Sequence, residues 1–140
     1  MRYFDTSVVV SLYINEGRTA SVDAELRKNP ADVIISPWVD IELKSALSLG
    51  VRSGRLSLQD ARTAFADYRS DRAQGRYHVQ VIDTRHFLVA EQHVTFNNTL
   101  RAGDSLHLAI VLVEMHTLVT GDNNLAQLAQ ALGIATVHIP

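Results

Sequence analysis

Apolar residues recur along this chain in two patterns, which predict two kinds of element. Short apolar runs with the length of buried strands stand at 2–4, 33–35, 78–82, 117–120 and 136–139. Longer stretches with apolar residues three and four positions apart predict helices, which begin near residue 5 and then lie at 18–28, 38–50, 57–76, 84–96 and 123–132. Strands and helices therefore alternate along the chain.

The stretch 100–114 differs from the other predicted helices. From Leu106 to Val113 it is apolar on every side except at His107, and a helix that is apolar all round is buried. Asp104 lies just before this run, where an unpaired carboxylate in a protein interior is costly. Either the free N–H groups and dipole of the first helical turn stabilise this acid, or a cation pairs with it.

The alternation of elements, without a hairpin-turn signal between strands, predicts a parallel sheet with helices on both faces. The expected fold is a three-layer α/β/α arrangement with a central parallel sheet of four to five strands. At 140 residues and 46% hydrophobic, the chain is long enough to bury one substantial core, so residues 1–140 are expected to form a single domain.

Composition excludes several classes of protein. The chain has no cysteine, which rules out disulfides, thiolate metal sites and a cysteine nucleophile. No stretch approaches the roughly 20 apolar residues of a membrane span, and the apolar start is too short for a signal peptide. We therefore expect a cytoplasmic protein that does not enter membranes. The net charge of −2 provides no overall attraction for nucleic acid, so any such binding needs a local patch.

Three further acids occupy unusual positions. Asp5 and Asp122 each follow a predicted strand, and ligands bind at the carboxyl ends of parallel strands. For both, capping of the next helix is the alternative. Glu42 has Trp38 and Ala46 as neighbours one helical turn away, which places it within an apolar face. It is either an inward-facing acid that needs a cation or an ordinary surface glutamate.

In the predicted fold, Asp5, Glu42, Asp104 and Asp122 can converge at one edge of the sheet. Four carboxylates in one pocket would repel one another and raise their pKa values unless a cation were present. Oxygen ligands alone select a hard divalent ion, Mg²⁺ or Mn²⁺.

Other charged residues have weaker patterns. Four arginines border the apolar face of helix 57–76 and could track a phosphate backbone, or they could be a solvated edge whose stems cover apolar surface: Arg62, Arg69, Arg72 and Arg76. His86 and His93 could share one helix face, but no third nitrogen ligand stands at metal spacing, which favours ordinary surface or core histidines.

Four segments, in this order, resemble the acidic motifs of PIN-domain ribonucleases, most closely the VapC-type toxins of bacterial type II toxin–antitoxin pairs. They are FDTSVVVSLYINE from residue 4, SPWVDIELKSALSLGVRSGRLS from 36, RAGDSLHLAIV from 101 and LVTGDNNLAQLAQALG from 118. The resemblance covers nearly the whole chain. Each motif alone is unspecific, whereas their order and spacing together are fairly specific.

The resemblance implies a PIN-like fold and a Mg²⁺- or Mn²⁺-dependent endoribonuclease that hydrolyses RNA phosphodiester bonds. Asp5 and Asp104 match the direct metal ligands, and Glu42 or Asp122 is the candidate base. Thr120 matches a Ser or Thr position that supports a carboxylate or a water. The resemblance further implies a small VapB-like antitoxin partner, which inserts a basic residue near the acids, and a homodimer. The VVVSLY stretch and the Trp38 helix are the candidate docking surface, with burial in the core as the alternative.

Two residues depart from the family pattern. Gly103 stands where a bulkier residue is more common, which could loosen the start of the central helix, and Asn123-Asn124 replaces a charged pair. Neither departure removes a candidate ligand.

Two other functions stay open at this point. An aspartyl-phosphate phosphotransfer protein also places an aspartate after the first strand. Such a protein needs a lysine at a late strand end, whereas Lys28 and Lys44 lie on early helices and are the only lysines of the chain. The other alternative is a catalytically silent PIN-like interaction module.

Overall fold

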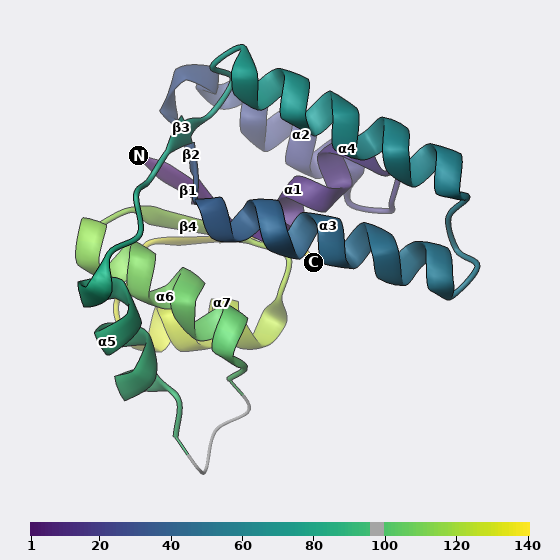
Figure 1. Ribbon diagram of the computed structural model, residues 1–140. Coiled ribbons are helices and arrows are strands. Elements are labelled where there is room, and N and C mark those ends of the chain that lie inside the picture. Colours follow the sequence, from purple (N-terminus) through teal and green to yellow (C-terminus); the bar gives the residue numbers. More distant parts are fainter. Residues whose placement is uncertain (96–99) are drawn as a thin grey trace.

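The structure is a computed structural model, which describes residues 1–95 and 100–140 (Figure 1). Helices and strands alternate in it as the apolar pattern predicts. In chain order the elements are β1 (Arg2–Phe4), α1 (Thr6–Tyr13), α2 (Thr19–Lys28), η1 (a short 3-10 helix, Pro30–Asp32), β2 (Val33–Ile35), α3 (Pro37–Arg52), α4 (Leu58–Ala73), β3 (His78–Val79), α5 (Thr84–His93), α6 (Ala102–Glu114), β4 (Thr117–Thr120), α7 (Asn123–Ala131) and β5 (Thr136–His138).

All pairings in the sheet are parallel, and the strand order is β3-β2-β1-β4-β5. The predicted parallel sheet of four to five strands is therefore confirmed. From β1 the chain moves outward through β2 to β3 and then returns to place β4 on the other side of β1. The direction of winding thus reverses between β1 and β4. In sheets of this kind, ligands bind beyond the carboxyl ends of the strands at such a reversal.

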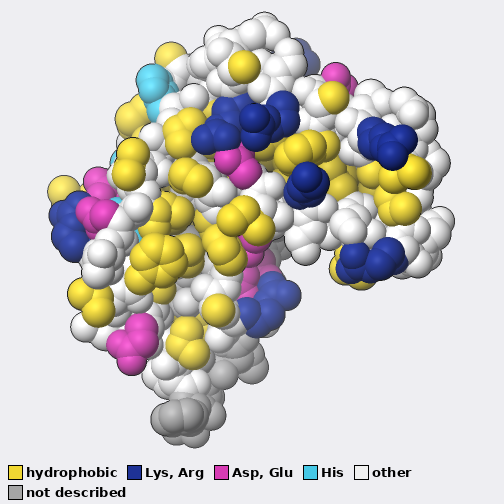
Figure 2. All heavy atoms as spheres, in the orientation of Figure 1, with side chains coloured by type: hydrophobic (Ala, Val, Ile, Leu, Met, Phe, Trp, Pro, Cys, Tyr) yellow, Lys and Arg dark blue, Asp and Glu magenta, His cyan; other side chains and the backbone are white. Residues whose placement is uncertain are grey.

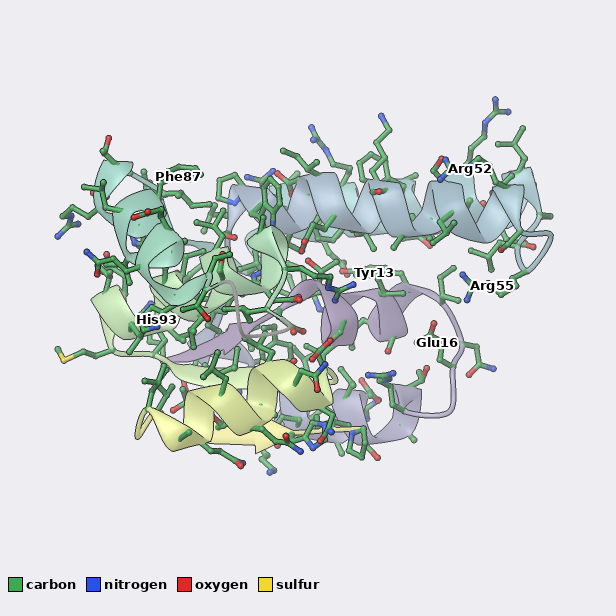
Figure 3. The ribbon with its side chains drawn as sticks, turned by 90° about the horizontal axis from the view of Figure 1, so that it is seen from below. Tyr13, Glu16, Arg52, Arg55, Phe87 and His93 are labelled. Atoms are coloured by element: carbon green, nitrogen blue, oxygen red, sulfur yellow. The ribbon has the colours of Figure 1, made fainter. Side chains whose placement is uncertain are left out.

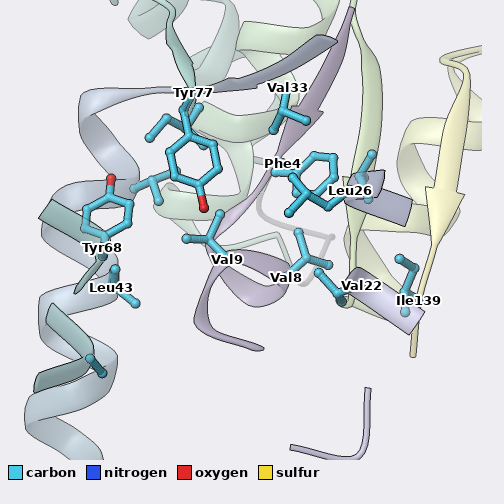
Figure 4. Packing of buried hydrophobic residues seen from close by; sticks show 14 of the residues in the cluster. Phe4, Val8, Val9, Val22, Leu26, Val33, Leu43, Tyr68, Tyr77 and Ile139 are labelled. Carbon is cyan, nitrogen blue, oxygen red and sulfur yellow. The ribbon is translucent and has the colours of Figure 1, made fainter. Parts of the chain in front are cut away.

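Alternate residues of each strand face opposite layers, because a strand has a period of two. Phe4, Val33 and Val119 join the core beneath α1, α2, α3 and α4, part of which Figure 4 shows. Tyr3 and Leu118, one position away, join the core formed with α5, α6 and α7. Figure 1 shows these two groups of helices on opposite sides of the sheet. The three-layer α/β/α fold is therefore confirmed.

Helix α6 is the most deeply buried helix of the described chain, as its apolar sequence predicts. Every residue from Ser105 to Val111 is buried. Ala102 at the start of the helix is exposed, and its first turn opens on the carboxyl edge of the sheet. Asp104 in this turn is therefore held at a fixed depth by a rigid, buried helix.

Element boundaries differ from the expectations by a few residues. Strand β3 is only His78–Val79, shorter than the predicted run 78–82. Helix α4 ends at Ala73, before the left-handed Gly75. Helix α5 ends at His93, and its predicted end at Phe96 lies outside the described residues. No helix of the described chain has the length and hydropathy needed to span a membrane.

Candidate active site at the carboxyl edge of the sheet

A cavity of about 280 Å³ opens at the carboxyl edge of the sheet, beside the reversal between β1 and β4. All four acids predicted from the sequence line it. Its lining consists of Asp5, Thr6, Ser7, Glu42, Ser45, Ala46, Leu49, Arg101, Asp104, His107 and Asp122. The pocket thus brings together residues of α1, α3 and α6 and the two acids that follow β1 and β4, which lie far apart in the chain.

Asp5 is the most buried of these acids, with 3% of its surface exposed. Its Oδ1 accepts hydrogen bonds from the Ser7 hydroxyl at 2.6 Å and from the Val8 backbone N–H at 3.2 Å. Burial raises the pKa of Asp5, and the nearby His107 and these hydrogen bonds oppose the rise. The N-cap role considered as an alternative is therefore real, but it uses only one of the two carboxylate oxygens.

Thr120 connects the two strand ends that flank the winding reversal. Its hydroxyl donates to Asp5 Oδ2 at 2.5 Å and accepts the backbone N–H of Asp122 at 2.9 Å. Thr120 thus holds a carboxylate, as its position in the resemblance implies. Asp122 in turn caps α7, since its Oδ1 accepts the N–H of Leu125 at 2.9 Å. Its Oδ2 faces the pocket.

Glu42 points inward, as one of its two sequence interpretations requires. Its Oε2 accepts hydrogen bonds from the Thr6 hydroxyl and from His107 Nε2, the latter at 2.7 Å. Burial alone would raise the pKa of Glu42, but these two partners and Trp38 lower it below the ordinary value. A charged carboxylate at this position is therefore stabilised by neighbouring donors.

His107 anchors Glu42 to the sheet. Its other ring nitrogen, Nδ1, shares a hydrogen bond of 2.7 Å with the Tyr3 hydroxyl, which also bonds Ser36 Oγ at 2.8 Å. Burial would lower the pKa of His107, whereas the hydrogen bond to Glu42 and the charges of Asp5 and Glu42 raise it above the ordinary value. A buried hydrogen-bonded chain therefore links β1, α3 and α6 behind the pocket.

Gly103 gives Glu42 room to approach α6. A Cβ atom at this position would lie 2.3 Å from Glu42 Oε1 and 3.4 Å from Trp38 Nε1. Gly103 remains within the regular helix, so its expected loosening of the helix start is not seen in the described structure. The departure from the family pattern instead accompanies close contact between Glu42 and the first turn of α6.

Asp104 lines the same pocket as Asp5 and pairs with an arginine. Arg101 Nε donates to Asp104 Oδ2 at 2.8 Å, and Nη2 donates to Oδ1 at 3.3 Å. The same Nη2 lies 3.5 Å from Asp122 Oδ2. The predicted cationic partner of Asp104 is thus, in this structure, a guanidinium that bridges two of the four acids.

The donor set of the pocket fits a hard divalent cation, since it offers carboxylate and hydroxyl oxygens without sulfur. The buried Asp5 carboxylate, whose pKa is raised, is also a group that a cation would stabilise. Within residues 1–95 and 100–140, however, no three acidic or histidine side chains converge closely enough to hold a metal ion. Metal binding therefore requires the carboxylates to rearrange around the ion.

The arginine row of α4 does not reach this pocket. Arg72 pairs with Asp40 of α3, Arg76 pairs with Asp71, and Arg62 lines a separate groove between α3 and α4. Arg69 is exposed on α4. None of the four lines the acidic pocket, so their binding of RNA stays a prediction.

His86 of α5 is part of the structural core. His86 is fully buried and accepts the backbone N–H of Asp83 at 3.1 Å, as part of the cap that begins α5. This arrangement agrees with the interpretation of His86 as a core histidine.

Sequence reasoning missed four contributors to the site: Thr6, Ser7, Arg101 and His107. His107 was the one polar residue in the apolar run of α6, and buried polar residues need partners. Arg101 stands three residues before Asp104, a spacing at which helical side chains meet. Thr6 and Ser7 follow Asp5 directly, and hydroxyl side chains at a helix start commonly bond neighbouring polar groups. Each signal was present, but no local pattern indicates which distant residue the side chain would contact.

Comparisons with known proteins agree with the fold described above. The model of the PIN domain family matches residues 2–131. No curated protein matches the chain in sequence. Among solved structures, the toxin VapC20 of Mycobacterium tuberculosis, described as cleaving the sarcin–ricin loop, has a TM-score of 0.72 and 18% identity, with 99% of each chain covered.

Two further solved structures are also similar. FitAcB of Neisseria gonorrhoeae has a TM-score of 0.68 and 18% identity, and the match covers 99% of this chain and 97% of that one. VapBC2 of Rickettsia felis, bound to a promoter DNA fragment, has a TM-score of 0.62 and 15% identity, with 99% and 98% covered. At these identities the likeness establishes the fold.

Proposed function

Because the chain belongs to the PIN domain family, we propose that it is a divalent-metal-dependent endoribonuclease and the toxin of a VapBC-type toxin–antitoxin pair. The observation that carries this proposal is the convergence of Asp5, Glu42, Asp104 and Asp122 on one pocket. The four acids come from separate segments of the chain, so the fold, and not closeness in sequence, brings them together.

The four acids would hold one or two Mg²⁺ or Mn²⁺ ions, with Asp5 and Asp104 as the direct ligands. Such ions lower the pKa of a bound water and neutralise charge that builds up on a phosphate in the transition state. The hydroxyls of Ser7 and Thr120 fix the Asp5 carboxylate from both sides. Thr6 and His107 orient Glu42, which is thereby placed as a candidate base for the attacking water.

The surroundings of the lysines favour hydrolysis over phosphotransfer. Lys28 pairs with Glu25, and Lys44 lies over the ring of Phe65 at 5.3 Å from its centre. Neither lines the acidic pocket in the described part of the chain. An aspartyl-phosphate protein needs a cation of this kind beside its phosphorylated aspartate, which Lys28 and Lys44 do not supply.

Cleavage of total cellular RNA by the purified protein, freed of any partner, tests the proposal. We expect discrete fragments with Mg²⁺ or Mn²⁺ and none with EDTA. Asp104→Asn should abolish cleavage, because the neutral isostere is a poor cation ligand. The matched control is Asp67→Asn, on the exposed side of α4. Cleavage that persists in Asp104→Asn, or in EDTA, would contradict the assignment.

We also propose that the antitoxin docks beside α1 and α3. Only part of the VVVSLY stretch can contact an antitoxin, since Val8 and Val9 are fully buried in the core. A groove of about 340 Å³ lies next to it, lined mainly by apolar side chains that include Val10, Leu49 and Leu56. Figure 3 shows Glu16 and Arg55 facing each other across its mouth. An amphipathic antitoxin segment suits such a groove.

The proposed homodimer would use another face. Figure 2 shows hydrophobic side chains gathered over α5 and the adjoining end of α3. Phe87 and Leu88 of α5 and Ile41 of α3 are 56%, 58% and 61% exposed. Light scattering should give the mass of two chains for the wild type and of one chain for Phe87→Ser. A monomeric wild type would remove the homodimer from the proposal.

A further inference from the structure

Arg101 is placed differently from the other arginines that form ion pairs. Its side chain is 75% exposed, yet it contacts two carboxylates of the acidic pocket, Asp104 and Asp122. These contacts are made through Nε and Nη2. The hydrogen bond to Asp104, followed by the charges of Asp104, Asp122 and Glu42, raises the pKa of this guanidinium. Arg101 therefore lies at the mouth of the pocket, between solvent and the acids.

The charge of the pocket creates a difficulty for an RNA substrate. Four carboxylates line it, and among its described lining residues Arg101 is the only arginine or lysine. A phosphate that approached this pocket would be repelled unless cations offset the carboxylates. A guanidinium binds carboxylates and phosphates with the same planar donor geometry. Arg101 is thus the lining residue best suited to receive an RNA phosphate.

The Nε–Nη2 edge of Arg101, one of the two edges that can bind a phosphate through two hydrogen bonds, is the edge that now contacts Asp104. Arg101 cannot bind a phosphate through this edge without releasing the carboxylate. The arginine side of this pair is 75% exposed and the Asp104 side 17% exposed, so the guanidinium can leave toward solvent without rearranging the buried helix. A divalent ion bound by Asp104 would also repel the guanidinium at short range. Metal binding would therefore free the arginine at the entrance through which a phosphate must pass.

We propose that Arg101 is a substrate-positioning residue that exchanges partners: it neutralises Asp104 and Asp122 in the metal-free protein, and it binds an RNA phosphate once a divalent ion has replaced it. The proposal rests on the metal-dependent nuclease function proposed above. It differs from a general electrostatic role, because it makes the contribution of Arg101 to nucleic-acid binding depend on the metal.

The test measures binding of a short single-stranded DNA oligonucleotide of mixed sequence, which presents phosphates while resisting a ribonuclease. Fluorescence anisotropy would compare wild type, Arg101→Gln and Arg101→Lys in Mg²⁺ and in EDTA. The control is Arg27→Gln, which removes an equally exposed arginine, 76% exposed and paired with Asp23 on α2.

In Mg²⁺ we expect Arg101→Gln to weaken binding about ten- to a hundredfold, the usual effect of one lost hydrogen bond to a charged group. The slope of log affinity against log salt should fall by about 0.7, the value for one contact to a single strand. Arg101→Lys should recover part of the loss, and Arg27→Gln should match the wild type. In EDTA the wild type and Arg101→Gln should bind almost equally.

If Arg101→Gln loses affinity by the same factor in Mg²⁺ and in EDTA, Arg101 acts only as a general surface charge and the proposal is overturned. No loss in either condition would overturn it as well. A second measurement follows the Nε–H NMR signal of Arg101 as Mg²⁺ is added, and this signal should move toward the position of a free arginine. If the backbone signals of α6 respond to Mg²⁺ but the Nε–H signal of Arg101 does not, the proposed exchange of partners is wrong, although the metal site is supported. If no signal responds, the proposed function itself fails.

Discussion

At the scale of single residues, the two oxygens of a carboxylate have separate roles in this protein. Asp5 Oδ1 and Asp122 Oδ1 each accept the N–H of a residue in the first turn of a helix, while the second oxygen faces Thr120 or the pocket. Helix capping and a functional role are therefore compatible. The cap fixes the orientation of the carboxylate, which a metal ligand requires.

Gly103→Ala should reduce RNA cleavage more than it reduces the stability of the fold. The new Cβ would lie 2.3 Å from Glu42 Oε1 and must displace that side chain from Thr6 and His107. Alanine improves helix propensity by about 1 kcal/mol, which offsets part of the lost hydrogen bonds. We expect cleavage to fall at least about tenfold, while the free energy of unfolding falls by less than the lost hydrogen bonds alone would cost. Gly17→Ala, which meets no atom within 4 Å, is the control. Full activity in Gly103→Ala would show that the position of Glu42 is unimportant.

His107 gives the pocket a pH-dependent contribution to stability. The pKa of His107 is raised in the folded protein, despite burial, by Glu42 and Asp5. Its contribution is therefore complete below the unfolded pKa of about 6.5 and is lost as pH rises through the higher folded pKa. In EDTA, the stability advantage of wild type over His107→Gln should shrink above about pH 6.5. Urea unfolding across this range checks it, with His78→Gln of the edge strand β3 as control.

At the scale of elements, α3 and α4 form a pair held by polar contacts as well as apolar ones. The Tyr68 hydroxyl of α4 donates to Asp40 of α3, and Arg72 pairs with the same carboxylate. The arginines that the sequence placed along the border of α4 therefore include at least one whose partner is a neighbouring helix. This pairing keeps α3 in place, and α3 carries Glu42 into the pocket.

Two buried tyrosines provide a matched test of which elements belong to the site. Tyr3 and Tyr68 are both fully buried, but only Tyr3 bonds His107. Tyr68→Phe and Tyr3→Phe should each lower the free energy of unfolding by about 1–2 kcal/mol, because each removes one buried hydrogen-bonding hydroxyl. Only Tyr3→Phe should also reduce cleavage. Equal activity of the two variants would separate the Tyr3–His107 chain from catalysis. Urea unfolding and the RNA assay give the two readouts.

At the scale of the whole molecule, the parallel sheet brings the site together. Strand ends β1 and β4 are adjacent in the sheet although they are more than a hundred residues apart in the chain, and Thr120 bonds Asp5 across that distance. Four carboxylates share this pocket, and Arg101 and His107 pair with three of them.

A bound cation should therefore stabilise the entire fold. At a Mn²⁺ concentration about 100 times its dissociation constant, the free energy of unfolding should rise by about 2.7 kcal/mol. Asp104→Asn should lose most of this gain, whereas Asp67→Asn should keep it. Thermal unfolding with and without Mn²⁺ measures the effect. An identical shift in both variants would mean that the ion binds elsewhere.

The sequence by itself determined the alternation of helices and strands, the burial of α6 and the identity of the four acids. These features follow from local periodicity and from residue types placed at strand ends and helix starts, which are encoded within short segments. Only the tertiary structure decided which partner each side chain meets. The pairing of Arg101 with Asp104 and Asp122, the contact of His107 with Glu42 and the room provided by Gly103 depend on distances between elements. Those distances arise when strands that are remote in sequence pair side by side, and no local pattern specifies them.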